Sequence, residues 1–175
     1  MTLPAKPCEI FLPDEEATVA LAQRLAPLLL GQAPAPGATG APQGAPGGRI
    51  HLRGDLGAGK TSLVRALLRA CGVSGRIKSP SYTLLESYNV SNLYFYHFDF
   101  YRFSDAHEWR DAGFGELLAE NAVVLIEWPE QAGTRLPPPD LDILLEYAGA
   151  GRRAWLSACS EKGQLWLTHL PPLRT

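Results

Sequence analysis

Hydrophobic and polar residues along the chain follow two spacings, which predict strands and helices in alternation. Residues 49–53 alternate as a short strand does, whereas residues 62–71 carry an apolar stripe at helical spacing that stops before Gly72. Residues 122–127 form an unbroken apolar run that ends in Glu127. Such a run is typical of a strand that a parallel sheet buries on both faces. The order of these segments predicts an α/β fold.

Flanking segments extend this pattern towards both ends of the chain. Residues 9–13 predict a first strand, and Asp14 can cap a following helix whose apolar face reaches Leu30. The remaining expected elements are strands at 82–88 and 93–99 around a turn at 89–92, a short helix at 116–120, and strands at 141–147, 153–158 and 164–170.

Residues 31–48 interrupt the pattern. They are almost entirely Gly, Ala and Pro, so they can neither bury a core nor hold a hydrogen-bonded ladder, and we expect a flexible surface linker there. The segment that precedes this linker is too short to fold alone. We therefore expect residues 1–175 to form a single domain that the linker interrupts.

Composition limits the binding partners and the cellular compartment that we expect, but it does not indicate a function. The net charge of −2 gives no support for a broad basic face that would bind nucleic acid unaided. No apolar run is long enough to span a bilayer, and the first seven residues carry no hydrophobic signal core. The cysteines at 8, 71 and 159 are odd in number and widely spaced, as is typical of a reduced cytoplasmic protein, and the histidines lack zinc-type spacing.

The most specific chemical signal is residues 54–61, which fit the phosphate-binding pattern G-x-x-x-x-G-K-[ST]. Glycines let this backbone curl so that successive N–H groups point at an anion, and the following helix aims its free N–H groups at the same anion. Lys60 would contact the β- and γ-phosphates, and Thr61 would offer a hydroxyl to Mg²⁺. The loop therefore predicts a nucleoside triphosphate site in a P-loop NTPase-like three-layer fold, with a mostly parallel central sheet and helices on both faces.

Two expected strands end in a carboxylate, Asp99 and Glu127. Ligands of open α/β sheets bind beyond the carboxyl ends of the strands, where such acids would bind Mg²⁺ or orient the attacking water. The hydroxyl-rich segment 79–83 follows the loop helix, where a nucleotide-sensing switch would lie, although a polar turn explains it equally well. Trp128 would pack beside the nucleotide or close a partner surface, and a place in the core or at its rim explains it equally well.

Two absences bear on the choice of nucleotide and reaction. The chain contains no N-K-x-D sequence, so adenine is favoured over guanine, and it leaves little length for the substrate lid of a nucleoside kinase. An ATPase that acts through conformational change is therefore favoured. A small-molecule kinase and a nucleotide-gated binding module that does not hydrolyse ATP stay open as alternatives.

The chain resembles the TsaE (YjeE) family, the small bacterial P-loop ATPases of tRNA threonylcarbamoyladenosine synthesis. The resemblance covers nearly the whole chain apart from the Ala/Gly/Pro-rich insert, and it is carried in order by residues 12–18, 54–61, 78–84, 96–102, 126–129 and 151–152. The phosphate loop alone is generic. The S-P-x-Y-T, H-x-D-x-Y-R and E-W-P blocks are specific.

The resemblance implies roles for individual residues. Lys60 would hold the ATP phosphates together with the loop backbone, and Asp99 would assist hydrolysis, so these two are the expected catalytic residues. Thr61 and Glu127 would bind Mg²⁺. The set expected to contact the nucleotide is Glu15, Thr18, Asp55, Leu56, Gly57, Ala58, Gly59, Lys60, Thr61, Ser62, Ser81, Asp99, Trp128 and Arg152.

The resemblance also implies cofactors and partners. ATP and Mg²⁺ would be the cofactors, and TsaD and TsaB the protein partners. ATP hydrolysis, slow without them, is thought to reset their complex between rounds of modifying the adenosine beside the anticodon. Contact with tRNA would be indirect, which agrees with the acidic balance. The chain departs from the family at Ser81, where threonine is common, and at the insert of residues 31–48.

Overall fold

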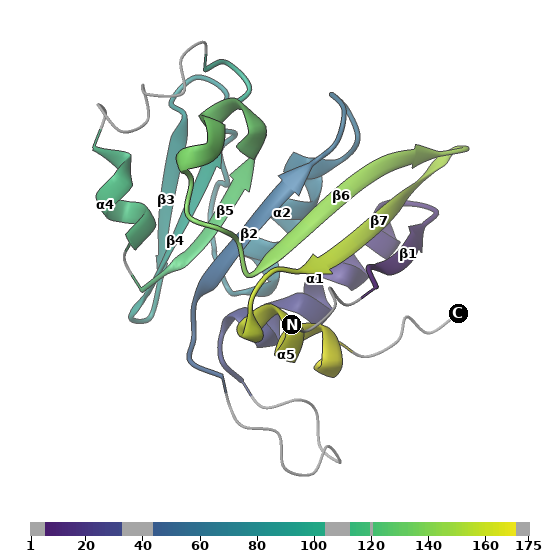
Figure 1. Ribbon diagram of the computed structural model, residues 1–175, viewed down its shortest axis with the longest axis horizontal. Helices are drawn as coiled ribbons and strands as arrows, with labels where there is room; N and C mark the ends of the chain where they lie inside the picture. The colour runs from purple at the N-terminus through teal and green to yellow at the C-terminus, as the bar shows by residue number, and fades with distance from the viewer. Residues whose placement is uncertain (1–5, 33–43, 104–112, 120, 171–175) are drawn as a thin grey trace.

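The computed structural model describes residues 6–32, 44–103, 113–119 and 121–170. Strands and helices alternate through most of this range (Figure 1). In chain order they are β1 (Cys8–Leu12), α1 (Glu15–Leu29), β2 (Gly48–Arg53), α2 (Lys60–Ala70), β3 (Leu85–Val90), β4 (Leu93–Asp99), α4 (Phe114–Ala119), β5 (Val123–Glu127), η1 (Pro129–Arg135), β6 (Leu141–Ala148), β7 (Gly151–Ala158) and α5 (Glu161–His169).

One seven-stranded sheet runs through the molecule in the order β1-β7-β6-β2-β5-β4-β3. The four central strands, β6, β2, β5 and β4, pair in parallel. The outer pairs β1–β7, β6–β7 and β3–β4 are antiparallel. The predicted α/β fold is confirmed, but the expectation of a mostly parallel sheet holds only for the centre. The β3–β4 and β6–β7 connections are two-residue turns, which can join only antiparallel strands.

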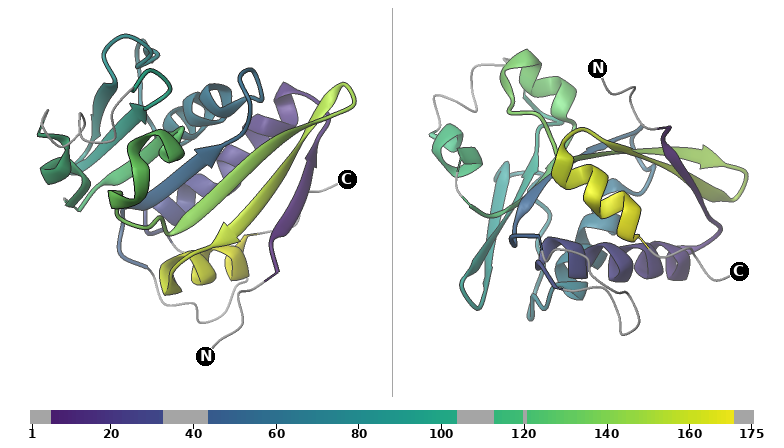
Figure 2. Two further views of the ribbon diagram at one scale, coloured as in Figure 1. Left: turned by 45° about the horizontal axis from the view of Figure 1, so that its top comes forward. Right: turned by 60° about the horizontal axis from the view of Figure 1, so that its bottom comes forward.

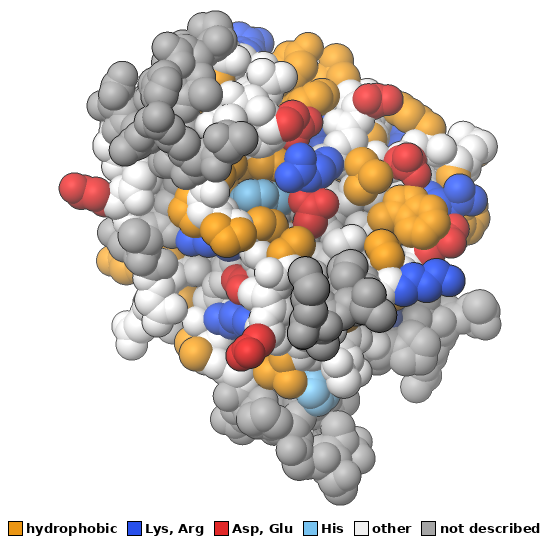
Figure 3. Space-filling model, in the orientation of Figure 1, with side chains coloured by type: hydrophobic (Ala, Val, Ile, Leu, Met, Phe, Trp, Pro, Cys, Tyr) orange, Lys and Arg blue, Asp and Glu red, His pale blue; other side chains and the backbone are white. Residues whose placement is uncertain are grey.

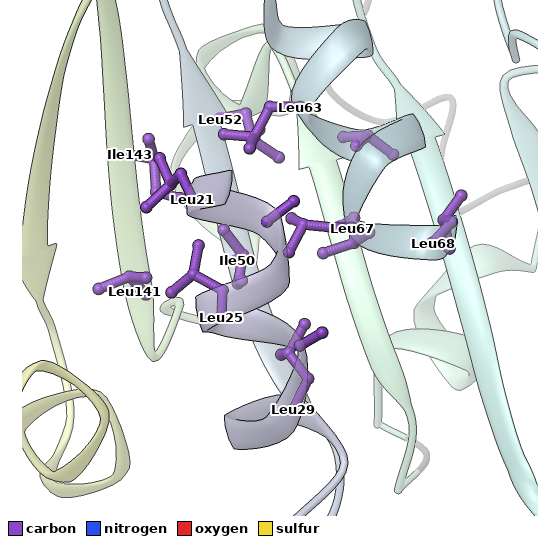
Figure 4. Packing of buried hydrophobic residues seen from close by; sticks show 14 of the residues in the cluster. Leu21, Leu25, Leu29, Ile50, Leu52, Leu63, Leu67, Leu68, Leu141 and Ile143 are labelled. Atoms are coloured by element: carbon purple, nitrogen blue, oxygen red, sulfur yellow. The ribbon is translucent and has the colours of Figure 1, made fainter. Parts of the chain in front are cut away.

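Helices cover both faces of the sheet, as expected (Figure 2). Helices α1 and α2 pack on one face, and α4 and η1 contribute to an aromatic cluster on the other. The first core is built from leucines that recur every fourth residue along α1, at 21, 25 and 29, against Ile50 and Leu52 of β2 (Figure 4). This spacing keeps one stripe of the helix on the sheet.

Local signals begin α1 where the sequence predicted. The Asp14 carboxylate accepts a hydrogen bond from the Ala17 N–H at 2.9 Å, and Glu15 and Glu16 lie in the first turn. The positive end of the helix dipole stabilises these negatively charged side chains, which in turn stabilise the start of the helix. Where the connection from α1 to β2 ends, the Gly47 N–H donates to Leu29 O, and Gly48 is the first residue of β2. Most of the expected linker, residues 33–43, lies outside the described residues.

Two sequence predictions about later elements were wrong. The strand expected at 164–170 is absent: residues 164–169 belong to α5, because the Ser160 hydroxyl caps the Gly163 N–H at 3.0 Å and Trp166 is buried against the α1 side of the core. The strand expected from residue 82 starts at Leu85. Its predecessor Leu84 has a φ of 65° and donates its N–H to Pro80 O in a turn.

The face of the molecule formed by β6 and β7 carries acidic, basic and hydrophobic side chains interspersed (Figure 3). Ion pairs join Arg153 to Glu9 at 2.8 Å and Arg53 to Asp142 at 2.7 Å on this side. No broad field of one sign covers this face. Among the described helices, none is both long and apolar enough to cross a lipid bilayer.

Candidate functional site

The loop between β2 and α2 follows the path that its glycines allow. Gly54, Gly57 and Gly59 have φ angles of 133°, 80° and 103°, which residues with a side chain rarely adopt. A side chain at Gly54 would also collide with the Leu145 carbonyl of β6. The loop therefore curls tightly at the carboxyl end of β2, where α2 begins.

A cavity of about 350 Å³ opens beside this loop. It is lined by Leu56, Gly57, Gly59, Lys60, Thr61, Ser62, Ser81, Asp99, Tyr101, Arg102, Glu127 and Trp128. Most of the residues that the sequence assigned to phosphates and metal thus lie around one space. Asp55 and Ala58 belong to the loop but do not line the cavity. The Ala58 N–H donates to Asp55 O at 3.0 Å and closes the turn.

Glu127 lies at the centre of the polar contacts in this cavity. Its side chain is only 3% exposed at the end of β5. The Thr61 hydroxyl, in the first turn of α2, lies 2.9 Å from both carboxylate oxygens. The ring Nε2 of His97, in the neighbouring strand β4, lies 2.8 Å from Oε1. These contacts satisfy a buried carboxylate that would otherwise be costly to desolvate.

Asp99 stands opposite Glu127 in the register of β4 and β5. Its Oδ1 accepts the Tyr101 N–H at 3.0 Å. Burial raises the pKa of Asp99 above its usual range, the Tyr101 hydrogen bond works against this, and the negative charge of Glu127 adds to the rise. The two acids that end expected strands therefore lie side by side, at the carboxyl ends of neighbouring parallel strands.

Lys60 is folded back onto its own loop. Its ammonium donates to Gly54 O at 2.6 Å and to Asp55 O at 2.9 Å, and it lies 4.1 Å from the centroid of the Trp128 ring. Burial lowers the pKa of Lys60, while nearby carboxylates, Glu127 first, oppose that shift. Trp128 has a left-handed backbone with φ 56° and ψ 48°, a strained conformation of the kind that clusters at functional sites.

A second cavity of about 260 Å³ adjoins the first and shares Gly59 and Ser62 with it. Glu15, Thr18 and Arg152 line it, so these three predicted residues lie next to the loop and away from Asp99 and Glu127. Arg152 donates to Gly57 O at 3.2 Å and stacks over Tyr147 at 4.3 Å. Ser81 lines the first cavity, and its hydroxyl lies 2.7 Å from that of Ser79.

The donor set fits a small divalent cation. A hydroxyl and a carboxylate, from Thr61 and Glu127, meet within hydrogen-bond distance, and Mg²⁺ prefers such hard oxygen ligands together with phosphate oxygens. Across the described ranges, no three His, Cys, Asp or Glu side chains gather closely enough to hold a metal by themselves. Thr61 and Glu127 could thus supply two ligands of a cation, and the remaining ligands would be other oxygens.

Two contacts at the site were missed by reasoning from sequence. Motifs in the sequence did not connect His97 with Glu127, whose carboxylate the fully buried His97 ring contacts. Its position two residues before Asp99 in one strand was an available signal, since residues two apart share a face. Tyr147 donates to Leu56 O at 2.9 Å, and nothing in the sequence indicated that contact.

Comparisons with known proteins agree on one family. A family model described as threonylcarbamoyl adenosine biosynthesis protein TsaE matches residues 12–154. The chain is 39% identical over 115 residues to a Haemophilus influenzae protein named for tRNA threonylcarbamoyladenosine biosynthesis, covering 66% of this chain and 73% of the relative. A Rickettsia felis protein of the same name is 36% identical over 145 residues, 82% of this chain and 75% of its own length.

A solved structure extends this similarity to the fold. The crystal structure of YdiB from Bacillus subtilis superposes with a TM-score of 0.72 at 26% sequence identity, covering 97% of each chain.

Proposed function

The chain belongs to the TsaE family, and from that premise we propose that it is a Mg²⁺-dependent ATPase serving the synthesis of threonylcarbamoyladenosine in tRNA. One observation supports the ATPase most directly. The phosphate loop, Thr61, Asp99 and Glu127 line a single cavity. Hydrogen-bond donors to phosphate, oxygen ligands for a metal and an acid to orient water would thus lie in one place.

The loop and the start of α2 would hold the triphosphate. Backbone N–H groups of the loop and the positive end of α2 favour the phosphate charge. Lys60 now donates to two loop carbonyls, and phosphate oxygens would compete for the same ammonium as stronger, charged acceptors. The neighbouring cavity beside Glu15, Thr18 and Arg152 would receive the adenosine part.

The carboxylates would divide the chemical work. Glu127 and the Thr61 hydroxyl, now in contact with each other, would bind the metal together, while His97 holds Oε1 of the carboxylate in place. When bound, Mg²⁺ would neutralise charge on the β- and γ-phosphates. Asp99, at the same end of the sheet, would orient the attacking water or order segment 79–83.

We further propose that the hydrolysis cycle regulates or resets a complex of TsaD and TsaB, and that tRNA is met through that complex. The chain's own charge supports this division, since the net charge is −2 and the β6–β7 face has no basic field (Figure 3). The proposed setting is the cytoplasm, where tRNA modification takes place.

Phosphate release from ATP tests the proposal. We expect slow release by the chain alone and faster release when TsaD and TsaB from the same organism are added, with Lys60→Ala as the inactive control. Absence of ATP binding in calorimetry would end the proposal.

The two alternatives predict other products. A phosphorylated acceptor in a metabolite screen would identify a kinase. ATP binding without any phosphate release, even with both partners present, would indicate a nucleotide-gated binding module.

A further inference from the structure

We propose that Tyr147, the second-to-last residue of strand β6, is a positioning residue that presets the phosphate loop by fixing the peptide plane between Leu56 and Gly57. The proposal rests on the proposed function, since it gives Tyr147 a part in holding a triphosphate at this loop. The tip of the β6–β7 hairpin and the loop lie at the same end of the sheet (Figure 1).

Two side chains of the hairpin reach two successive carbonyls of the loop. The Tyr147 hydroxyl donates to Leu56 O at 2.9 Å, and the Arg152 guanidinium donates to Gly57 O at 3.2 Å. Tyr147 and Arg152 are partners in the β6–β7 register, and the guanidinium lies 4.3 Å from the centroid of the tyrosine ring. Each side chain therefore steadies the other while both hold the loop.

Holding a carbonyl also orients the N–H of the same peptide plane, because the two groups point in opposite directions across a trans peptide. The Leu56 carbonyl turns towards the hairpin, so the Gly57 N–H points away from it. Arg152 holds the next peptide plane, between Gly57 and Ala58, by its carbonyl oxygen. The N–H of that plane, which belongs to Ala58, donates to Asp55 O at 3.0 Å. Because the Ala58 N–H is already hydrogen-bonded, the neighbouring Gly57 N–H is left for an anion in the cavity, which Gly57 lines.

The backbone conformation chiefly explains the glycine at position 57. Its φ of 80° is unfavourable for other residues, and a Cβ there would lie 2.7 Å from the Tyr147 hydroxyl. When the N–H is already oriented, binding an anion costs less conformational entropy of the loop than when the anion must order the loop itself. Tyr147 would thus strengthen triphosphate binding without touching the nucleotide.

The competing interpretation is an exposed hairpin tyrosine with an incidental hydrogen bond. Tyr147 is 54% exposed, so removal of its hydroxyl should leave the core and the melting temperature unchanged. Any effect on the loop then separates the positioning role from a structural one.

Tyr147→Phe in the full chain tests the role, because it removes only the hydroxyl and keeps the ring beneath Arg152. Tyr94→Phe is the matched control, since Tyr94 is 52% exposed at the start of β4 in the other hairpin. The affinities for ADP and for inorganic tripolyphosphate are measured by calorimetry. Amide hydrogen exchange of Gly57 is measured by NMR in the ligand-free protein.

We expect Tyr147→Phe to weaken tripolyphosphate binding about three- to tenfold, the range that one neutral hydrogen bond supports. Gly57 exchange should accelerate, and the KM for ATP should rise with kcat nearly unchanged, since the contact acts before and during reaction alike. Tyr94→Phe should match the wild type. Equal affinity and equal Gly57 exchange in Tyr147→Phe and wild type would overturn the positioning role alone, whereas failure of the wild type to bind either ligand would overturn the proposed function.

Discussion

Asp99 and Glu127 stand side by side in register at the carboxyl ends of the parallel strands β4 and β5. Their surroundings differ. The Thr61 hydroxyl and the His97 ring contact Glu127, whereas Asp99 accepts a backbone N–H and has a pKa raised chiefly by burial. Neighbouring acids in unlike environments suit unlike tasks. Under the proposed function, Glu127 binds the metal and Asp99 acts on water.

Replacing Lys60 with alanine should remove most of the affinity for ATP. The ammonium is the cation nearest the expected phosphates, and charge-assisted hydrogen bonds of this kind support a loss of about ten- to a hundredfold. Calorimetry with ATP measures it, and Lys78→Ala, an exposed lysine, serves as the control. Unaltered ATP affinity in Lys60→Ala would remove Lys60 from the site.

Replacing Asp99 with alanine should impair turnover far more than binding. Asp99 lies at the cavity wall and has no part in the loop that would hold the phosphates. General acid–base groups typically contribute about a hundredfold or more to rate, so a fall of that order in kcat is expected. Binding by calorimetry and single-turnover phosphate release separate the two effects. A collapse of binding with normal turnover per bound ATP would contradict the assignment.

Replacing His97 with phenylalanine should weaken metal binding in the nucleotide complex. The ring would keep its volume but lose the nitrogen that lies 2.8 Å from Glu127 Oε1. Loss of a contact that orients a metal ligand commonly costs about ten- to a hundredfold in metal affinity. Electron paramagnetic resonance of Mn²⁺ with ADP measures this affinity.

His97→Gln is the informative companion variant, since its amide can donate to the same carboxylate. We expect it to restore part of the Mn²⁺ affinity, and we expect metal-free ADP to bind both variants about as it binds the wild type. Normal Mn²⁺ affinity in His97→Phe would leave His97 with a packing role only.

His51 should make folding stability depend on pH. Burial, and then the charges of Arg53 and Arg49, lower its pKa to about 3, and neither ring nitrogen has a hydrogen-bond partner among the described residues. His51 therefore takes up a proton near pH 6.5 in the unfolded chain, but only near pH 3 in the folded chain. As pH falls through this window, His51 should lower the free energy of unfolding by about 1.4 kcal/mol per pH unit.

Urea denaturation of His51→Leu against wild type at pH 7.5, 6 and 5 isolates this contribution. Stabilities should be similar at pH 7.5, because leucine fills the space and no hydrogen bond is lost. The variant should gain relative to wild type at pH 5. Parallel curves for the two proteins across this range would show that His51 is not the source.

The sequence predicted the parts of the site that depend on local rules. A run of glycines before Lys60 and Thr61 carries its own backbone conformation, so the phosphate loop was readable from residues 54–61. The apolar run before Glu127 identified a buried strand, and the acid at its end lies at the edge of the sheet where open α/β folds generally bind ligands. These signals need no knowledge of distant segments.

What the sequence alone did not determine depended on segments meeting across the fold. Residues 165–167 are a short apolar run that suits a strand or a helix, and only the Ser160 cap and the buried Trp166 decided for α5. His97 became a partner of Glu127 through the register of β4 and β5, and Tyr147 reached Leu56 through the placement of a hairpin. Backbone preference and burial are written into neighbouring residues, whereas register and strand order are set only when the whole core packs.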